Sequence, residues 1–515
     1  MDSRAWGRAS RRKVALAVAL SLVGLTACSN YERVQSLGAG TGAAATSAGP
    51  SGSGSRGPAT GSGVAGSTGS AVGGSVSSGG PSSLGGGGNS GVGPGASASG
   101  GAVAGHTSGG ACTVKVGVTY SSDVNAALAG AGDPSQAANY GNYVAALQAE
   151  YQAGADWINA NGGIGGCHMA LAYYDFKSLS ADGFDAESQR ECVSLAEDQH
   201  VNVAFIYGLE TRTVIDCMAA HKIPVFYHGG EYTVPNDRDY TQYRGYLYQE
   251  TGFSTDRWGP FIDFLAQSGY FDKGSKVGIL LADDGNGNNQ HLVNDIWKPR
   301  LAQLGYSNPT VFTFTQLKSY SAIGDTQAQL SSAVLKFKLA GVDHIIATPD
   351  SGNTTLFFPQ QAESQDYHPR YAFTSVNYPE LMKNVPADQA ARSMSVSFLA
   401  SDAENPPAMA SNYPNPARTA CDNLFKGKTN GGPAPYLYCD FMNVVTSAMK
   451  GRLPFGADTL RVGIEGLGTS IIGTGDYGGT RFGSGRYDGG TSVRVMEWDP
   501  AISDYRYITG PLNVP

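Results

Sequence analysis

In the stretch WINANGGIGGCHMALAYYD, residues 157–175, four glycines separate a helix-like segment from a strand-like one. Upstream, apolar residues recur at spacings of three and four and predict a helix over 140–161; they are Val144, Leu147, Tyr151, Ala155 and Ile158. A phosphate-binding loop needs its glycines after a strand and before a helix. Here they close a helix and lead into a strand, so we expect a helix cap and a tight turn, not a nucleotide site.

The same alternation continues along the chain. Strands are expected at 113–119, 169–174, 202–207 and 223–227, with helices at 140–161, 185–198 and 212–221. A second block predicts strands at 276–281, 310–314, 342–347 and 371–374, with helices at 261–268, 289–304, 328–339 and 355–364. Such alternation is typical of α/β folds with parallel sheets covered by helices on both faces. The sequence therefore predicts two doubly wound lobes, and the Tyr-rich stretch 240–248 is a candidate crossover between them.

The last part of the chain departs from this alternation. A strand is expected at 395–399, two helices at 416–426 and 436–450, and a strand pair at 491–498 and 505–508. We interpret this as a late return to the first lobe. The predicted boundaries are 112–245 and 399–490 for lobe 1, 246–398 for lobe 2, and 491–515 for a strand pair at the hinge or on lobe 2.

The N-terminus has the pattern of an export signal. Basic residues precede an apolar run at 14–27, which is too short to span a membrane comfortably. The run ends in Leu25-Thr26-Ala27-Cys28, which resembles a bacterial lipobox, so residues 1–27 are expected to be a signal peptide and Cys28 to be lipidated. An ordinary export signal, or a twin-arginine signal at Arg11-Arg12, is the alternative. Residues 28–110, rich in Gly, Ser and Ala, offer few large apolar side chains and predict a disordered tether.

The net charge and the number of cysteines indicate which classes of protein this chain can belong to. The formal net charge is −8 and the sequence pI is about 5.5, which gives no electrostatic footprint for nucleic acid. Six cysteines remain when Cys28 is set aside, and an even number in an exported chain suggests disulfides. The anchor and tether together place the folded part outside the cytoplasmic membrane, held close to it.

Several segments, in order, resemble the type I periplasmic binding proteins, most closely the branched-chain amino-acid (Leu/Ile/Val) solute-binding family of ABC importers. They are VKVGVTYSS, GADWINANGGIGG, FIYGLETRTV, IPVFYHGGEYTV, SKVGILLADDGNGNN, AGVDHIIATPDSGNT and YAFTSVNYPEL. The resemblance covers nearly all of residues 112–515. It implies two lobes that close on a small ligand. In that fold the cysteines could pair as Cys112 with Cys167, Cys192 with Cys217, and Cys421 with Cys439.

Ligands of open α/β sheets bind beyond the carboxyl ends of the strands. The candidates are Tyr120, Ser121, Ser122, Gly208, Glu210, Thr211, His228, Gly229, Gly230, Asp284, Asp350, Ser351, Asn377 and Tyr378. The resemblance implies that Thr211 and the Gly229-Gly230 turn hold a ligand carboxylate. The resemblance also implies that an acidic side chain of the second lobe holds a ligand ammonium. The matching position falls near Asn377, where this sequence has an amide side chain instead. Glu210 or Asp350 could take that role.

No catalytic motif is recognisable: a G-x-S-x-G elbow and an H-E-x-x-H pair are both absent from the sequence. Residues 283–289 lack the register of a calcium loop. We therefore expect no enzyme activity, no cofactor and no metal. The prediction is a monomeric, lipid-anchored solute-binding protein that delivers a small polar ligand, an amino acid or a related amide or acid, to an ABC permease. The alternatives are a ligand sensor of the same fold and a secreted hydrolase.

Overall fold

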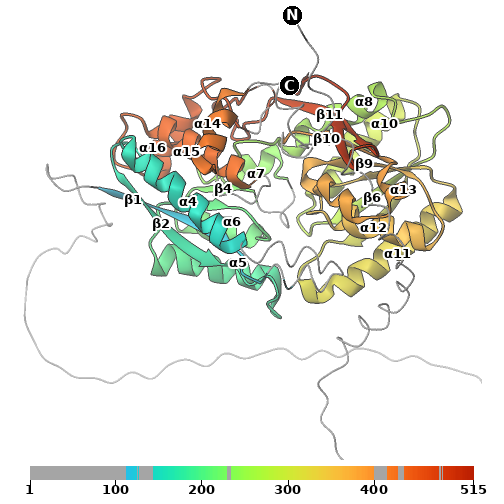
Figure 1. Ribbon diagram of the computed structural model, residues 1–515, viewed down its shortest axis with the longest axis horizontal. Coiled ribbons are helices and arrows are strands. Elements are labelled where there is room, and N and C mark those ends of the chain that lie inside the picture. Colours follow the sequence, from blue (N-terminus) through green and yellow to red (C-terminus); the bar gives the residue numbers. More distant parts are fainter. Residues whose placement is uncertain are drawn as a thin grey trace, which may run out of the picture. The chain divides into compact units, whose positions relative to one another are not determined.

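The computed structural model describes residues 112–123, 126, 143–228, 234–399, 415–426, 434–474, 477 and 479–515 (Figure 1). The predicted signal peptide, Cys28 and the tether lie outside these residues, and so do Gly229 and Gly230. Among the described helices, none is long and apolar enough to cross a bilayer.

The first sheet has five parallel strands in the order β2-β1-β3-β4-β5. Its strands are β1 (Thr113–Tyr120), β2 (His168–Asp175), β3 (Val203–Ile206), β4 (Val225–Tyr227) and β5 (Leu247–Tyr248). The helices that alternate with them are α4 (Tyr143–Ala160), α5 (Gly183–Val193), α6 (Arg212–Ala220) and α7 (Asp237–Gln242). A π-helical turn, Ser194–Asp198, extends α5. The reversal of strand order at β1 makes this a doubly wound sheet.

Three helices from the end of the chain return to the first sheet. They are α14 (Pro416–Phe425), α15 (Ala434–Met449) and α16 (Ala457–Glu465). The Tyr438 hydroxyl on α15 donates to the carbonyl of Tyr151 on α4, and the two rings lie 4.7 Å apart. Side chains of α15 and α16 share one hydrophobic core with β1, β3 and β4. Residues almost 290 positions apart therefore build a single lobe (Figure 1).

The second sheet has eight strands, seven of them in the order β12-β11-β10-β9-β8-β6-β7, while β13 pairs with β11. They are β6 (Val277–Asp283), β7 (Thr310–Thr315), β8 (His344–Ala347), β9 (Arg370–Thr374), β10 (Ser393–Ser397), β11 (Ser492–Asp499), β12 (Asp504–Tyr507) and β13 (Leu512–Asn513). The strands β6 to β10 run parallel, and β11 joins β10 antiparallel. The predicted C-terminal strand pair is thus part of this sheet.

Helices cover both faces of the second sheet. They are α8 (Gly259–Gln267), α9 (Asn288–His291), α10 (Lys298–Gln303), α11 (Ile323–Ala340), α12 (Asn353–Ser364) and α13 (Ala387–Ala390). A π-helical segment, Leu292–Trp297, joins α9 to α10, so the single helix expected at 289–304 has three parts. Leu280 and Ile345 pack on one side of the sheet, and their neighbours Ile279 and Ile346 on the other. Burial on both faces explains why these strands are continuously apolar.

The glycine-rich stretch performs the structural role that the sequence predicts. Gly162, Gly163, Gly165 and Gly166 have φ values of 99°, 72°, 62° and 93°, a region that favours glycine. A Cβ on Gly163 would lie 2.0 Å from the carbonyl oxygen of Cys167. The four glycines end α4 and reverse the chain into β2, which confirms the turn.

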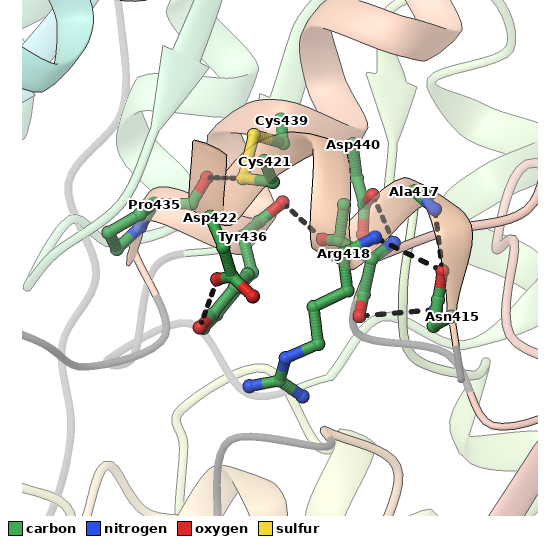
Figure 2. The surroundings of a disulfide bond; sticks show 10 residues. Asn415, Ala417, Arg418, Cys421, Asp422, Pro435, Tyr436, Cys439 and Asp440 are labelled. Carbon is green, nitrogen blue, oxygen red and sulfur yellow. Dashed lines mark hydrogen bonds between the residues drawn. A yellow bond between two sulfur atoms is a disulfide. The ribbon is translucent and has the colours of Figure 1, made fainter. Parts of the chain in front are cut away.

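The three predicted disulfides are present: Cys112–Cys167, Cys192–Cys217 and Cys421–Cys439. The first joins the starts of β1 and β2, the second joins α5 to α6, and the third joins α14 to α15. Figure 2 shows the third bond beside the N-terminus of α14, where the Asn415 side chain accepts from the backbone N–H groups of Ala417 and Arg418. All three bonds lie in elements of the first lobe.

The crossover expected at 240–248 is wrong. That stretch holds the end of α7, and then β5, which pairs with β4 in the first sheet. The chain passes between the sheets after Tyr248, where Gly489 N donates to Gln249 O at 2.8 Å and Gly490 N to Gly252 O at 2.9 Å. A Cβ on Gly489 would lie 2.1 Å from Glu250 O, so these connections are closely packed. The domain boundary at 245 and 246 stays a prediction, but Leu247 and Tyr248 belong to the first sheet.

Candidate functional site

A polar cavity of about 240 Å³ opens between loops of the first sheet and loops of the second. The first lobe contributes the start of α5 and of α6, and the second contributes the segments that follow β6 and β7. The lining residues are Asp185, Thr211, Arg212, Thr213, Asp216, Asp284, Gly285, Asn286, Gln316, Leu317 and Lys318. Three carboxylates, two cations and two hydroxyls therefore surround one small volume.

The first wall is the N-terminal turn of α6. The Thr211 hydroxyl caps this helix by accepting from Thr213 N, and Thr211 N donates to the Ser188 hydroxyl at 2.9 Å. Arg212 is held by the Tyr243 hydroxyl at 2.9 Å and by buried Asp239 at 3.2 Å. The guanidinium also lies over the Tyr243 ring, 5.2 Å from its centroid. The Tyr-rich stretch thus orients a cavity cation from outside the cavity.

The second wall begins directly after β6. The Asp284 carboxylate accepts the backbone N–H groups of Asn286, Gly287, Asn288 and Asn289 at 2.8–3.2 Å. It therefore satisfies free N–H groups at the start of α9 and fixes the loop that faces the cavity. Asp284 and the asparagines of 283–289, the stretch compared above with a calcium loop, form these hydrogen bonds.

The two walls touch in the described structure. Phe184 N donates to Lys318 O at 2.9 Å, and the Phe184 ring lies 5.7 Å from that of Tyr320. Asn288, on the second lobe, donates to Asp239 at 2.8 Å and accepts from Asn236 at 2.9 Å, both on the first. These hydrogen bonds and the ring contact join the two lobes next to residues that line the cavity.

Of the predicted site residues, Thr211 and Asp284 line this cavity. The serines after β1 are tied locally: Ser121 donates to Asp123, and Ser122 donates to Asp175 at the end of β2. Tyr120 ends β1 and packs against the first core. Gly208 lies against the Glu210 side chain. His228 pairs with buried Glu250.

The predicted residues after β8 and β9 form a buried network in the second lobe. Asp350 accepts from Thr354 N at 2.6 Å, from the Thr354 hydroxyl and from the Asn377 amide at 2.8 Å. Asn377 also donates to Thr348 O and accepts from Thr374 N. Ser351 and Tyr378 occupy the turns beside this network with positive φ. Asn377, Asp350, Ser351 and Tyr378 are outside the lining of the cavity.

Burial raises the pKa of two acidic residues that were predicted to belong to the ligand site. The pKa of Asp350 rises to about 6, chiefly because the group is desolvated, although its hydrogen bonds oppose the shift. The pKa of Glu210 rises to about 7 for the same first cause. Neither carboxyl is fully solvated, so each favours its neutral form more than an exposed acid does.

Several lining residues were not among the sequence candidates: Asp185, Arg212, Asp216, Gln316 and Lys318. Gln316-Leu317-Lys318 follows an expected strand, so the strand-end rule could have found it. Asp185, Arg212 and Asp216 lie within helices, and only the packing of α5 and α6 places them at the cavity.

No protein-family model and no curated protein matches this chain. Solved structures do match it in fold. A branched-chain amino-acid transporter substrate-binding protein, LivJ, from Streptococcus pneumoniae in complex with isoleucine has a TM-score of 0.53 and 17% identity, and the match covers 78% of this chain and 99% of that one. The chain has the type I periplasmic binding protein fold.

Two further matches show what else this binding-protein fold accommodates. A solute-binding protein of an ABC transporter from R. palustris, in complex with 4-hydroxybenzoate, has a TM-score of 0.54 and 15% identity over 78% of this chain and 98% of its own. A fatty-acid ABC transporter substrate-binding protein from Thermomonospora curvata has a TM-score of 0.53 and 14% identity over 78% and 92%. The ligands named for these neighbours differ in charge and polarity, so the fold does not specify one.

Proposed function

We propose that this chain is an extracytoplasmic solute-binding protein that captures a small polar ligand between its lobes and delivers it to an ABC permease. The polar cavity bounded by both lobes carries this proposal, because such a position lets a ligand contact both sides only when the lobes are closed. No chemical step is involved. Lipidation of Cys28 would hold the protein at the membrane, and residues 28–110 would tether it.

The size and charge of the cavity favour a small zwitterion, an amino acid or a related amide or acid. Its volume of about 240 Å³ is below the roughly 300–1,000 Å³ of pockets for drug-sized ligands. Asp185 and Asp216 face it from the first lobe, and Lys318 from the second. A ligand with both charges could therefore complement the two walls. The hydroxyl of Thr213 and the amide of Asn286 add neutral polar contacts.

A thermal-shift screen of the full chain tests the proposal. The panel holds amino acids, amides, aromatic acids, polyamines and sugars, and a ligand at 100 times its Kd should add about 2.7 kcal/mol of stability. Chemical analysis should recover the ligand unchanged. Silence across the panel, or turnover of the bound compound, would contradict the proposed function.

Matched variants test whether the cavity is the binding site. Lys318→Met and Asp185→Asn alter lining side chains, and we expect each to weaken binding of the identified ligand about tenfold, or about 1.4 kcal/mol. Lys273→Met and Asp182→Asn change exposed residues that are not part of the lining. Calorimetry should give unchanged affinity for these controls. Equal affinity in all four variants would place the ligand elsewhere.

A further inference from the structure

Two glutamates are completely buried behind the first wall of the cavity. Glu191 lies on α5, and Glu210 lies between β3 and α6; the exposed fraction of each is 0%. Glu210 directly precedes Thr211, the cap of α6 and a lining residue. Asp185, another lining residue, lies on the same helix as Glu191. One glutamate therefore lies on α5 and the other just before α6, the two helices that form this wall.

Three of the four carboxyl oxygens lack a hydrogen-bond partner in the described part of the chain. The Thr119 hydroxyl donates to Glu191 Oε1 at 2.5 Å, whereas Glu191 Oε2 and both oxygens of Glu210 have none. Buried polar atoms without partners are rare in folded proteins, and buried charges without counter-ions are rarer.

Among the residues that the structure describes, the charged and titratable groups near the pair supply no free cation. On α5, Arg190 is bound to Glu187 and Asp182, and Glu187 also accepts from the Tyr174 hydroxyl of β2. At the end of β4, His228 pairs with Glu250. The Tyr227 hydroxyl donates to the main-chain carbonyl of Glu210, not to its carboxyl group. The local surroundings thus favour uncharged carboxyl groups.

Elementary electrostatics limits the charge that this pair can carry. Two carboxylates in one desolvated site repel each other, so at least one of them keeps a proton at a pH where an exposed glutamate has lost it. Burial raises the pKa of Glu191 well above its usual value, and the neighbouring Glu210 raises it further. A protonated carboxyl can also donate a hydrogen bond that a carboxylate cannot.

We propose that the Glu191–Glu210 pair is a pH-sensitive switch in the cavity wall, which holds α5 against the start of α6 while it is protonated and loosens that wall when it is deprotonated. The effect on ligand affinity rests on the proposed function; the effect on the wall itself does not. The Cys192–Cys217 disulfide limits the separation of α5 and α6, so the change is local.

The direction of the pH dependence follows from linkage. The folded chain retains a proton that the unfolded chain releases near pH 4.5, so rising pH favours the unfolded state. Stability is therefore highest below about pH 4.5 as far as this pair is concerned. It declines as the pH rises through the pKa of Glu210, about 7, and the raised pKa of Glu191 acts in the same direction.

Thermal unfolding of the full chain between pH 5 and pH 8 tests the switch. We expect the Tm of the wild type to fall by about 3 °C more than that of Glu210→Gln, in which one acid is removed. Asp198→Asn changes an exposed acid in the π-helical turn that extends α5 and should keep the wild-type slope. Identical slopes for the wild type and Glu210→Gln would overturn the proposal.

Infrared spectroscopy gives a readout that does not depend on a variant folding. The wild type at pH 6 should show the C=O band of protonated, buried carboxyl groups, to which Asp350 also contributes, and the band should weaken as the pH rises and the pair loses its proton. Glu191→Gln serves as the second variant if Glu210→Gln does not fold. Absence of the band at pH 6 in the wild type would show that the pair is ionised and would overturn the switch.

Hydrogen exchange and ligand binding separate this proposal from the proposed function. After correction for intrinsic rates, amides of 183–193 and 208–216 should exchange faster at pH 8 than at pH 6 in the wild type but not in Glu210→Gln. If the screen finds a ligand, its affinity should fall about threefold over that range in the wild type alone. A panel without hits would count against the transport role only, whereas exchange independent of pH would count against the switch.

Discussion

The two lobes of this chain are stabilised by different means. The first has a five-stranded sheet and contains all three disulfides, whereas residues 277–397 and 492–513, which hold the strands of the second, contain no cysteine. The second has an eight-stranded sheet with both faces buried. In the segments that follow β6 and β8, the side chains of Asp284 and Asp350 accept hydrogen bonds from backbone N–H groups. Covalent links constrain the unfolded chain, whereas caps and packing stabilise the native state directly.

The largest expected effect is loss of the disulfide between α5 and α6. In the chain-entropy description, a closed loop of 25 residues contributes about 3.5 kcal/mol. We expect Cys192→Ala with Cys217→Ala to lower the stability of the first lobe by about that amount. Denaturation followed by hydrogen exchange should show early opening of the first sheet. Simultaneous opening of both sheets would show that the lobes unfold as one unit, and would remove the contrast between them.

A smaller loss is expected from Asp350→Ala in the second lobe. The change removes the acceptor of Thr354 N and of the Asn377 amide and leaves both donors buried. Helix caps and charged hydrogen bonds of this kind are worth about 2–3 kcal/mol together. Urea unfolding should report the loss, and Asp272→Asn, on a side chain that is 77% exposed, is the control. An equal effect of both changes would mean that the buried cap contributes little.

The smallest effect concerns His291, whose ring nitrogens lie 2.7 Å from Asp256 and from Asp295. The Asp256 hydrogen bond is the first cause that raises the pKa of this histidine. Its stabilisation is therefore present below about pH 6.5 and is lost as the pH rises through the raised value. Because the groups are partly exposed, we expect less than about 1 kcal/mol, reduced further by salt. His291→Gln, unfolded at pH 5.5 and pH 8 with and without salt, measures it.

The salt dependence sharpens the comparison between the lobes. Solvent screens the His291 ion pairs, but it does not reach Glu191 and Glu210 in the first lobe. High salt should therefore remove the pH dependence that His291→Gln abolishes and leave the one that Glu210→Gln abolishes. If salt reduced both pH dependences to the same extent, this would indicate that water reaches the Glu191 and Glu210 side chains.

Three acidic residues that follow strands show what could be predicted from the sequence and what could not. Glu210, Asp284 and Asp350 all follow strands and were expected at a ligand site. In the structure, Asp284 lines the cavity and accepts backbone N–H groups of α9, Asp350 accepts from Thr354 N of α12, and Glu210 is completely buried. A strand-end position sets which edge of the sheet a residue occupies. It does not set whether the side chain binds its own backbone, the core or a ligand.

The alternation of strands and helices, the role of the four glycines after Trp157 and the even number of cysteines can all be read from the sequence. These follow from local periodicity and backbone conformational preference, which act over a few residues. Packing between distant segments places β5 beside β4 in the first sheet, brings residues of α5 and α6 to the cavity lining, and buries Glu191 and Glu210 completely. Such contacts depend on packing between segments distant in the chain, and no local pattern encodes them.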